Sequence, residues 1–173
     1  MDIAITGSSG LIGEALRARL RAEGHRVVRV VRHEPAGPDE IRWDPARGHL
    51  EPTDLSGLHA VVHLAGEGIA EKRWTAAQKE RILTSRTLGT TLLAERLAAA
   101  EDGPRILISG SAIGWYGDRG DEVLTEASAP GETGDRAARF LSKLCVDWEA
   151  AGQEAVALGA RVGMDRTTTM QAA

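Results

Sequence analysis

Three glycines near the N-terminus stand at a spacing that suits the binding of a nucleotide phosphate. Residues 3–13 read Ile-Ala-Ile-Thr-Gly-Ser-Ser-Gly-Leu-Ile-Gly, so an apolar strand runs directly into Gly7, Gly10 and Gly13 and then into a helical pattern. Gly7 would let the chain turn sharply off the strand, Gly10 would let the backbone approach a pyrophosphate, and Gly13 would let the helix pack tightly on the sheet. The helix N-terminus would add N–H groups and a positive dipole end. The residues that we expect to hold the pyrophosphate of a dinucleotide are Gly7, Ser9, Gly10, Leu11, Ile12 and Gly13. Glycines that serve only a tight turn are the alternative.

The end of the second predicted strand carries the residue that would distinguish NADP from NAD. This strand, residues 26–31, is followed by Arg32. In a dinucleotide-binding fold an acidic side chain here hydrogen-bonds the 2′-hydroxyl of NAD, whereas an arginine accommodates the 2′-phosphate of NADP. Arg32 therefore favours NADP as the cofactor over NAD. Glu34 follows two residues later, and a solvated basic strand end is the alternative interpretation.

Two further predicted strands deliver small and hydroxyl-bearing residues to the same edge of the sheet. One ends in Ala65 and Gly66, which suit close approach by the nicotinamide-side ribose. The other is followed by Ser111 and Tyr116, whose hydroxyl groups could orient a substrate carbonyl or hydroxyl beside the nicotinamide. Ser111 and Tyr116 are therefore the candidate catalytic residues, with serines that only form turns as the alternative.

Other residues of chemically versatile types are interpreted as structural. His63 lies inside a predicted buried strand, where a core histidine is expected rather than an acid or base that reaches a substrate. Cys145 lies in an apolar helical segment and is expected to be a small core residue rather than a nucleophile. The histidines show no ligand spacing together with Cys145, so no metal site is expected. Trp74 and Trp115 are interpreted as packing anchors, with contact to a substrate ring as the alternative.

Short apolar runs alternate with longer helical patterns along the chain. Strands are predicted at residues 2–6, 26–31, 60–65, 105–109 and 160–164, and helices at 11–23, 75–100 and 137–158. This alternation predicts an α/β fold with a doubly wound parallel sheet of the Rossmann type. Residues 41–45 are expected to form a short edge strand that ends at its proline. Ligands bind at the carboxyl ends of such strands, so the loops at residues 66–74 and 110–136 would frame the site.

Composition limits the classes of partner and compartment. The chain has 173 residues, of which 42% are hydrophobic, and a formal net charge of −4 with no basic patch of the kind that nucleic-acid binding needs. The apolar runs have the length of strands rather than of membrane spans. Met1 leads directly into the first strand, which leaves no room for a signal peptide, and a single cysteine cannot form an internal disulfide. A cytoplasmic protein with a small-molecule substrate is expected, with neither nucleic acid nor membrane as partner.

The chain is expected to divide into an NAD(P)-binding domain at residues 1–162 and an irregular tail at residues 163–173. A core strand begins at residue 160, but the sequence that follows has neither periodicity nor a capping residue. This pattern indicates a truncated or frame-shifted product, with a natural irregular terminus as the alternative.

Several short motifs together match a known protein family. They are Thr-Gly-Ser-Ser-Gly-Leu-Ile-Gly at 6–13, His-Leu-Ala-Gly-Glu-Gly-Ile at 63–69, Lys-Arg-Trp-Thr at 72–75, Ser-Arg at 85–86, Ser-Gly-Ser-Ala-Ile-Gly-Trp-Tyr-Gly at 109–117 and Trp-Glu-Ala-Ala at 148–151. The sequence thereby resembles the atypical extended short-chain dehydrogenase/reductases of the epimerase family, which are relatives of nucleotide-sugar epimerases. The resemblance implies an NADP-binding doubly wound domain followed by a smaller substrate domain, and this chain stops before the second domain.

The chain departs from the superfamily at its catalytic positions. The resemblance implies a Ser, Tyr and Lys set with Tyr-x-x-x-Lys spacing, in which the lysine lowers the tyrosine pKa so that the phenol can exchange a proton with the substrate. Lys143 is present, but Arg139 stands four residues earlier, and Tyr116 is the only tyrosine. Ser111 alone aligns with the catalytic set, so Tyr116 or a carboxylate such as Glu67 would have to replace the usual acid and base. In addition, Arg86 occupies a helix position where relatives carry a structural asparagine.

The function expected from these residues is NADP-dependent, reversible hydride transfer on a nucleotide sugar or a related hydroxyl or carbonyl compound. A non-catalytic NADP-binding or sensing module is the rival expectation, and the missing Tyr-x-x-x-Lys motif supports it. An inactive fragment of the full enzyme is a third. Loss of the substrate domain would expose apolar surface on the final strand and the helices, which favours a homodimer or aggregation.

Overall fold

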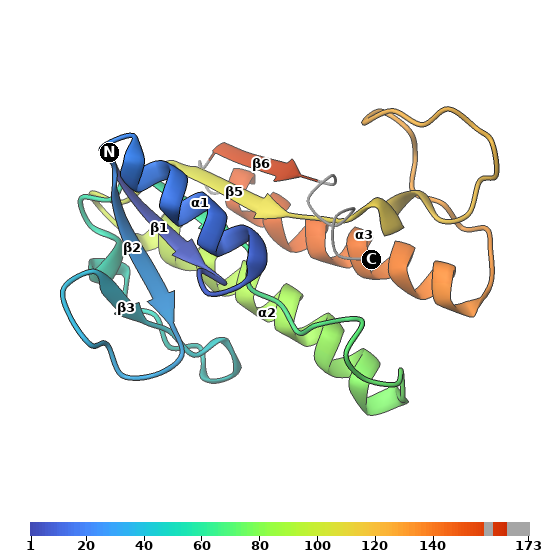
Figure 1. The fold of residues 1–173 in the computed structure, drawn as a ribbon, viewed down its shortest axis with the longest axis horizontal. Helices are drawn as coiled ribbons and strands as arrows, with labels where there is room; N and C mark the ends of the chain where they lie inside the picture. Colours follow the sequence, from blue (N-terminus) through green and yellow to red (C-terminus); the bar gives the residue numbers. More distant parts are fainter. Residues whose placement is uncertain (158–160, 166–173) are drawn as a thin grey trace.

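Runs of β-branched and other apolar residues form a six-stranded sheet in the order β3-β2-β1-β4-β5-β6 (Figure 1). The computed structural model describes residues 1–157 and 161–165, and their side chains through residue 153. The strands are β1 (Asp2–Thr6), β2 (Arg26–Val31), β3 (Glu40–Arg42), β4 (Ala60–His63), β5 (Ile106–Gly110) and β6 (Arg161–Asp165). Every strand pair in the sheet is parallel. The predicted doubly wound parallel α/β sheet of the Rossmann type is confirmed.

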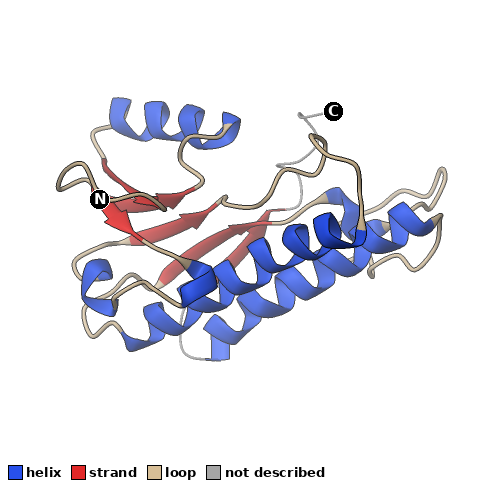
Figure 2. Ribbon diagram, turned by 90° about the horizontal axis from the view of Figure 1, so that it is seen from below, coloured by secondary structure: helices blue, strands red, loops and turns tan. Residues whose placement is uncertain are grey.

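Helices cover the sheet unequally. The α-helices of the described residues are α1 (Leu11–Ala22), which follows the glycine loop, and the longer α2 (Ala76–Ala99) and α3 (Arg136–Ala157). Figure 2 shows α1 on one face of the sheet and α2 and α3 side by side on the other. The Thr75 hydroxyl caps α2 by accepting a hydrogen bond from the Gln78 N–H at 3.2 Å. The connection from β1 to β2 runs over one face of the sheet, and the connection from β4 to β5 runs over the other. The strand order therefore reverses between β1 and β4. In folds of this kind, ligands bind in the crevice at the carboxyl ends of the two strands that flank such a reversal.

Apolar side chains on both faces hold the two central strands in place. On the α1 face, Leu16 and Leu20 pack against a cluster of buried strand residues that includes Ile5. On the opposite face, Leu93 and the fully buried Leu107 belong to a larger cluster. Since β1 and β4 contribute to both clusters, their carboxyl ends form a rigid base for the loops that follow.

Strand β4 ends earlier than the sequence predicts. The prediction extends the strand to residue 65, whereas β4 ends at His63. Beyond His63, the N–H groups of Leu64 and Ala65 both donate to the Thr6 side-chain oxygen at 3.1 Å. The Leu64 N–H keeps a longer backbone bond to the Thr6 carbonyl at 3.4 Å, and the Thr6 hydroxyl then takes the place of a backbone partner for Ala65, where the ladder has ended.

The ends of the sheet also differ from the predictions. The edge strand is Glu40–Arg42, and Pro45 begins a short 3₁₀ helix, η1 (Pro45–Arg47), rather than ending the strand. A further 3₁₀ helix, η3 (Ile113–Tyr116), lies in the segment 110–136 predicted as a loop, and another, η2 (Pro52–Leu55), lies where no element was predicted. Strand β6 continues to Asp165, where the sequence predicts an irregular tail from residue 163, because residues 163–165 pair with the end of β5. Residues 166–173 of that predicted tail lie outside the described part of the chain.

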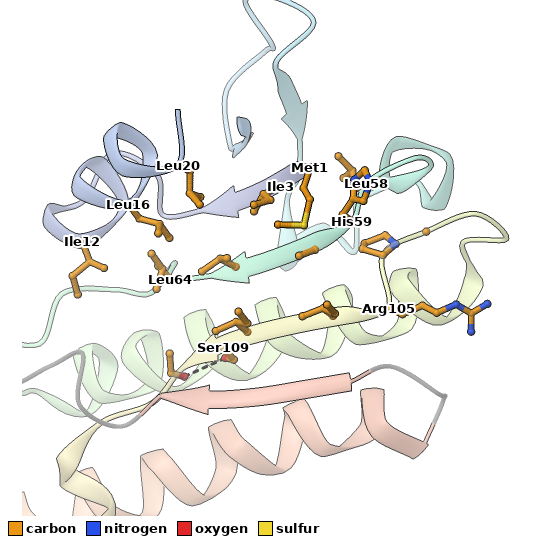
Figure 3. A pocket seen from close by; sticks show the side chains of 17 residues that line it. Met1, Ile3, Ile12, Leu16, Leu20, Leu58, His59, Leu64, Arg105 and Ser109 are labelled. Carbon is orange, nitrogen blue, oxygen red and sulfur yellow. Dashed lines mark hydrogen bonds between the residues drawn. The ribbon is translucent and has the colours of Figure 1, made fainter. Parts of the chain in front are cut away.

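A large apolar hollow lies beside α1 over strands β4 and β5 (Figure 3). Its volume is about 860 Å³, and its walls include Leu16 of α1, Val62 of β4 and Ile106 and Ile108 of β5. Both isoleucines are 42% exposed. Parallel sheets normally bury both faces, whereas the described residues leave this part of the sheet exposed. None of the helices described here combines the length and apolarity that crossing a membrane requires.

Candidate functional site

The glycine loop between β1 and α1 is shaped by two close backbone approaches. Gly7 has a φ of +64°, and a Cβ atom at this position would lie 2.7 Å from the Leu64 carbonyl carbon. A Cβ on Gly13 would lie 2.3 Å from the Gly7 carbonyl oxygen. A Cβ on Gly10 would meet only the Gly7 carbonyl oxygen at 3.4 Å, an ordinary van der Waals contact, and Gly10 is exposed. The loop therefore folds back tightly on itself while leaving one side accessible to a ligand.

The first turn of α1 fits an anionic group. Gly10 is the N-cap residue and offers no side chain to cap the helix. Its carbonyl accepts the Glu14 N–H at 2.8 Å, but the preceding N–H groups of Leu11, Ile12 and Gly13 have no side-chain cap. These donors and the positive end of the helix dipole suit a phosphate. The geometry thus fits the pyrophosphate of a dinucleotide.

Two arginines support the loop from beneath. The Arg17 guanidinium donates to the Ser8 carbonyl at 2.9 Å, and Arg29 approaches the Ser8 hydroxyl at 3.3 Å. Arg29 also pairs with Glu40 at 2.8 Å. This support could not be predicted from sequence, because these contacts join positions that no local motif connects. Arg32, in contrast, is exposed after the end of β2.

A buried hydrogen-bond unit joins the carboxyl ends of β1 and β4. The Thr6 hydroxyl lies 2.7 Å from His63 Nδ1 and accepts the N–H groups of Leu64 and Ala65. Burial, helped by the positive charge of Arg86, lowers the pKa of His63 to about 3, so its imidazole is neutral. His63 is fully buried, which confirms the prediction of a core histidine. Its role is to fix the strand ends that flank the glycine loop.

A cavity of about 220 Å³ lies between the glycine loop, the end of β5 and α3. The predicted site residues that line it are Gly7, Gly10, Leu11, Ile12, Gly13 and Ser111. The predicted residues Ser9, Arg32, Ala65, Gly66 and Tyr116 are not among its lining. The wall also includes side chains that were not predicted to belong to the site, among them Arg86 from α2 and Cys145 and Trp148 from α3. The glycine loop and Ser111 therefore face one common space.

Ser111 is paired with a buried carboxylate. Its hydroxyl donates to Glu149 at 2.6 Å, and both residues are buried. Glu149 lies one turn after Cys145 on the buried side of α3, so helical spacing from the apolar positions was the signal that could have identified it. Glu67, the carboxylate considered from sequence, instead binds Lys72 at 2.9 Å and Gln78 at 3.2 Å outside the cavity. The Lys72 and Gln78 hydrogen bonds lower the pKa of Glu67.

Arg86 forms a fixed part of the cavity wall. Its Nη1 donates to the carbonyls of Glu67 at 3.0 Å and Ile82 at 3.1 Å. The guanidinium carbon lies 5.1 Å from the centre of the Trp148 ring. A Cβ on Gly66 would come within 3.1 Å of that carbon, so the glycine leaves room for the arginine. Burial lowers the pKa of Arg86, while the neighbouring Cys145 and Glu67 raise it.

Lys143 does not reach the cavity. Its side chain is 74% exposed, and its ammonium group binds Asp147 at 2.8 Å. Arg139, four residues earlier, is also exposed. The two helix positions where the superfamily pattern places tyrosine and lysine therefore face solvent. The usual Tyr-x-x-x-Lys chemistry has no counterpart at these positions.

The remaining candidate side chains have structural contacts. The Trp74 indole donates to the Ile69 carbonyl at 2.6 Å, and the Trp115 indole donates to the Ser128 carbonyl at 3.2 Å, as expected for packing anchors. Burial is the main cause that raises the pKa of Cys145 to about 11, which keeps it a thiol and confirms a core residue. Within the described residues, no group of three or more His, Cys, Asp or Glu side chains is placed to hold a metal ion.

Comparison with known proteins places this geometry in a family. The family model described as the NAD dependent epimerase/dehydratase family matches residues 3–164. An epimerase family protein of Mycobacterium bovis is 46% identical over 165 residues, covering 95% of this chain and 52% of the relative. The chain spans about half the length of the curated relatives it matches.

Solved structures give the same assignment. The nucleoside-diphosphate sugar epimerase from Corynebacterium glutamicum has a TM-score of 0.80 and 42% identity, covering 96% of this chain and 33% of that one. The human epimerase family protein SDR39U1 with NADPH has a TM-score of 0.78 and 31% identity, covering 96% of this chain and 53% of that one. MoeE5 in complex with UDP-glucuronic acid and NAD has a TM-score of 0.70 and 30% identity, covering 96% and 54%. The chain belongs to the NAD-dependent epimerase/dehydratase family.

Proposed function

We propose that this chain binds NADP and serves reversible hydride transfer on a nucleotide sugar or a related hydroxyl or carbonyl compound. The observation that carries the proposal is the common cavity, in which the uncapped N-terminus of α1 and Ser111 face the same space. The NADPH complex of the human relative and the nucleotide-sugar complex of MoeE5 support this choice.

The cofactor-binding residues have separate roles in the proposal. The glycine loop, with Ser9 and the first turn of α1, holds the pyrophosphate, and Ala65 with Gly66 receives the nicotinamide-side ribose. Arg32 binds the 2′-phosphate from its exposed position after β2. Bound NADP supplies a nicotinamide that accepts or gives up a hydride.

Ser111 and Glu149 would handle the proton that accompanies hydride transfer. Ser111 binds the substrate oxygen, and its own hydroxyl proton already points to Glu149. As a substrate alcohol becomes a carbonyl, its proton passes to Ser111 Oγ while the serine proton moves to the Glu149 carboxylate. The reverse transfer protonates the oxygen when a carbonyl is reduced. Tyr116, at the end of η3, is the second candidate for this proton exchange.

A non-catalytic NADP-binding module is the second candidate function. One observation favours it: Lys143 lies in solvent with Asp147, so the lysine expected from the superfamily pattern contributes nothing to the cavity. This alternative shares the cofactor site and differs only in the absence of turnover.

Calorimetric titration with NADPH and NADH tests the cofactor site. We expect tighter binding of NADPH, and an Arg32→Ala variant that loses the preference while still binding NADH. A wild-type chain that binds neither dinucleotide would contradict the proposal.

Turnover distinguishes the enzyme from the binding module. NADPH oxidation is followed with a panel of nucleotide-sugar and simple carbonyl compounds. We expect Ser111→Ala to lower the rate by roughly 10²-fold or more, as for loss of a proton-transfer group. Lys143→Ala, on the exposed side of the same region, should leave the rate unchanged. Cofactor binding without oxidation of any compound would favour the module.

A further inference from the structure

The Arg86 guanidinium is held rigidly at the cavity. Two carbonyls fix its Nη1, the centre of the Trp148 ring lies 5.1 Å from its guanidinium carbon, and a Cβ on Gly66 would come within 3.1 Å of that carbon. An exposed arginine would move its charge away from an unfavourable ligand. Arg86 cannot do so without breaking these contacts, so its charge acts on whatever occupies the cavity.

No carboxylate neutralises this charge by direct pairing. Among the described side chains, none forms an ion pair with Arg86, and its two carbonyl partners are uncharged. The Glu67 carboxylate is bound by Lys72 and Gln78, and the Glu149 carboxylate binds Ser111 without lining the cavity. The cavity therefore has a positive wall, in addition to the positive end of α1.

The size and position of the cavity indicate which part of the cofactor meets Arg86. The cavity adjoins the pyrophosphate loop, and its volume of about 220 Å³ is small. Sites for complete drug-sized ligands measure roughly 300–1,000 Å³. Under the proposed function, the group that continues from the pyrophosphate into this space is the nicotinamide end.

We propose that Arg86 makes this site favour the reduced, uncharged nicotinamide of NADPH over the oxidised, positively charged nicotinamide of NADP⁺. Like charges repel most strongly where water is partly excluded, as it is at this half-buried wall. Arg86 thereby supplies the fixed positive charge of the site that Lys143, which points into solvent, does not. The inference rests on the proposed function, since it places the nicotinamide in the cavity.

The test compares the dissociation constants of NADP⁺ and NADPH, measured by calorimetry at one salt concentration. We expect the wild-type chain to bind NADPH more tightly. Arg86→Gln should lower the ratio of the NADP⁺ dissociation constant to the NADPH dissociation constant by roughly tenfold, as expected for loss of one nearby charge. Arg86→Lys keeps the charge and should keep most of the preference. Arg32→Ala removes a cation outside the cavity and should weaken the binding of NADP⁺ and NADPH equally.

The possible results separate the inference from the proposed function. Equal affinity of the wild-type chain for the two forms overturns the inference, whether or not the variants fold. An unchanged ratio in a folded Arg86→Gln variant that binds both forms also overturns it, while the cofactor site stands. Failure of the wild-type chain to bind either form overturns both. Thermal unfolding of each variant establishes that it is folded before it is titrated.

Discussion

At the scale of single residues, the glycine loop combines two separable constraints, a backbone conformation and a close approach. Gly7 and Gly48 have nearly the same φ, +64° and +65°. A Cβ on Gly7 would strike the Leu64 backbone at 2.7 Å, whereas a Cβ on Gly48 would meet nothing within 4 Å. Alanine substitutions at the two glycines therefore separate the free-energy cost of the steric contact from that of the left-handed backbone conformation.

We expect Gly48→Ala to lower the free energy of unfolding by about 1 kcal/mol, the order of cost for a left-handed backbone. Gly7→Ala should lose roughly 3 kcal/mol or more, because the new methyl group must displace the backbone after β4. Urea unfolding of the two variants provides the comparison. Equal losses would mean that the loop relaxes easily and that only the φ of Gly7 matters.

At the scale of the elements, the Thr6–His63 contact makes the join between β1 and β4 sensitive to acid. The pKa of His63 falls from an ordinary value of 6.5 to about 3 in the folded protein, chiefly through burial. Below pH 6.5 the His63 imidazole binds a proton in the unfolded chain but stays neutral in the folded protein. The stability that is fully present above pH 6.5 is therefore lost as the pH falls toward 3.

This predicts a slope of up to about 1.4 kcal/mol per pH unit in the free energy of unfolding below pH 6.5. Urea unfolding at several values between pH 7.5 and 4.5 measures it, a range chosen because the carboxylates titrate mainly below it. His63→Asn keeps a polar group beside Thr6 but cannot take up a proton, and should flatten the slope. The same slope in both proteins would assign it to other groups.

The regular elements could be predicted from sequence because their signals are local. The predicted boundaries of the three long helices agree with the structure to within one residue. Apolar periodicity and the glycine loop determine them within a short window. The end of β4 could not be predicted in this way, because it depends on a hydroxyl from β1, far away in sequence.

The candidate site was predictable only in part, for a related physical reason. The glycine loop and Ser111 follow strands directly, so the fold alone brings them to one edge. Arg86 instead reaches the cavity, and Glu149 reaches Ser111, through their positions on the faces of long helices. Which face turns toward the cavity depends on how α2 and α3 pack. Apolar spacing in α3 indicates the side that carries Glu149, but Arg86 itself gives no apolar signal of its orientation.

At the scale of the whole molecule, the two faces of the sheet are covered to different extents. Both α2 and α3 pack on one face, while α1 leaves the hollow over β4 and β5 open (Figures 2 and 3). The Ile106 and Ile108 side chains at this surface belong to β5, which lies between β4 and β6 in the sheet. Large contiguous apolar surfaces of this kind promote association.

We therefore predict concentration-dependent self-association of this chain through the hollow. Replacing Ile106 and Ile108 together by threonine keeps β-branched residues in β5 while making the exposed face polar, and should shift the chain toward the monomer. Sedimentation velocity over a range of concentrations measures the shift. Val123→Thr is the matched control, because Val123 is 88% exposed but does not line the hollow, and it should change nothing. A chain that stays monomeric at every concentration, or a double variant that associates as the wild type does, would show that this face does not drive assembly.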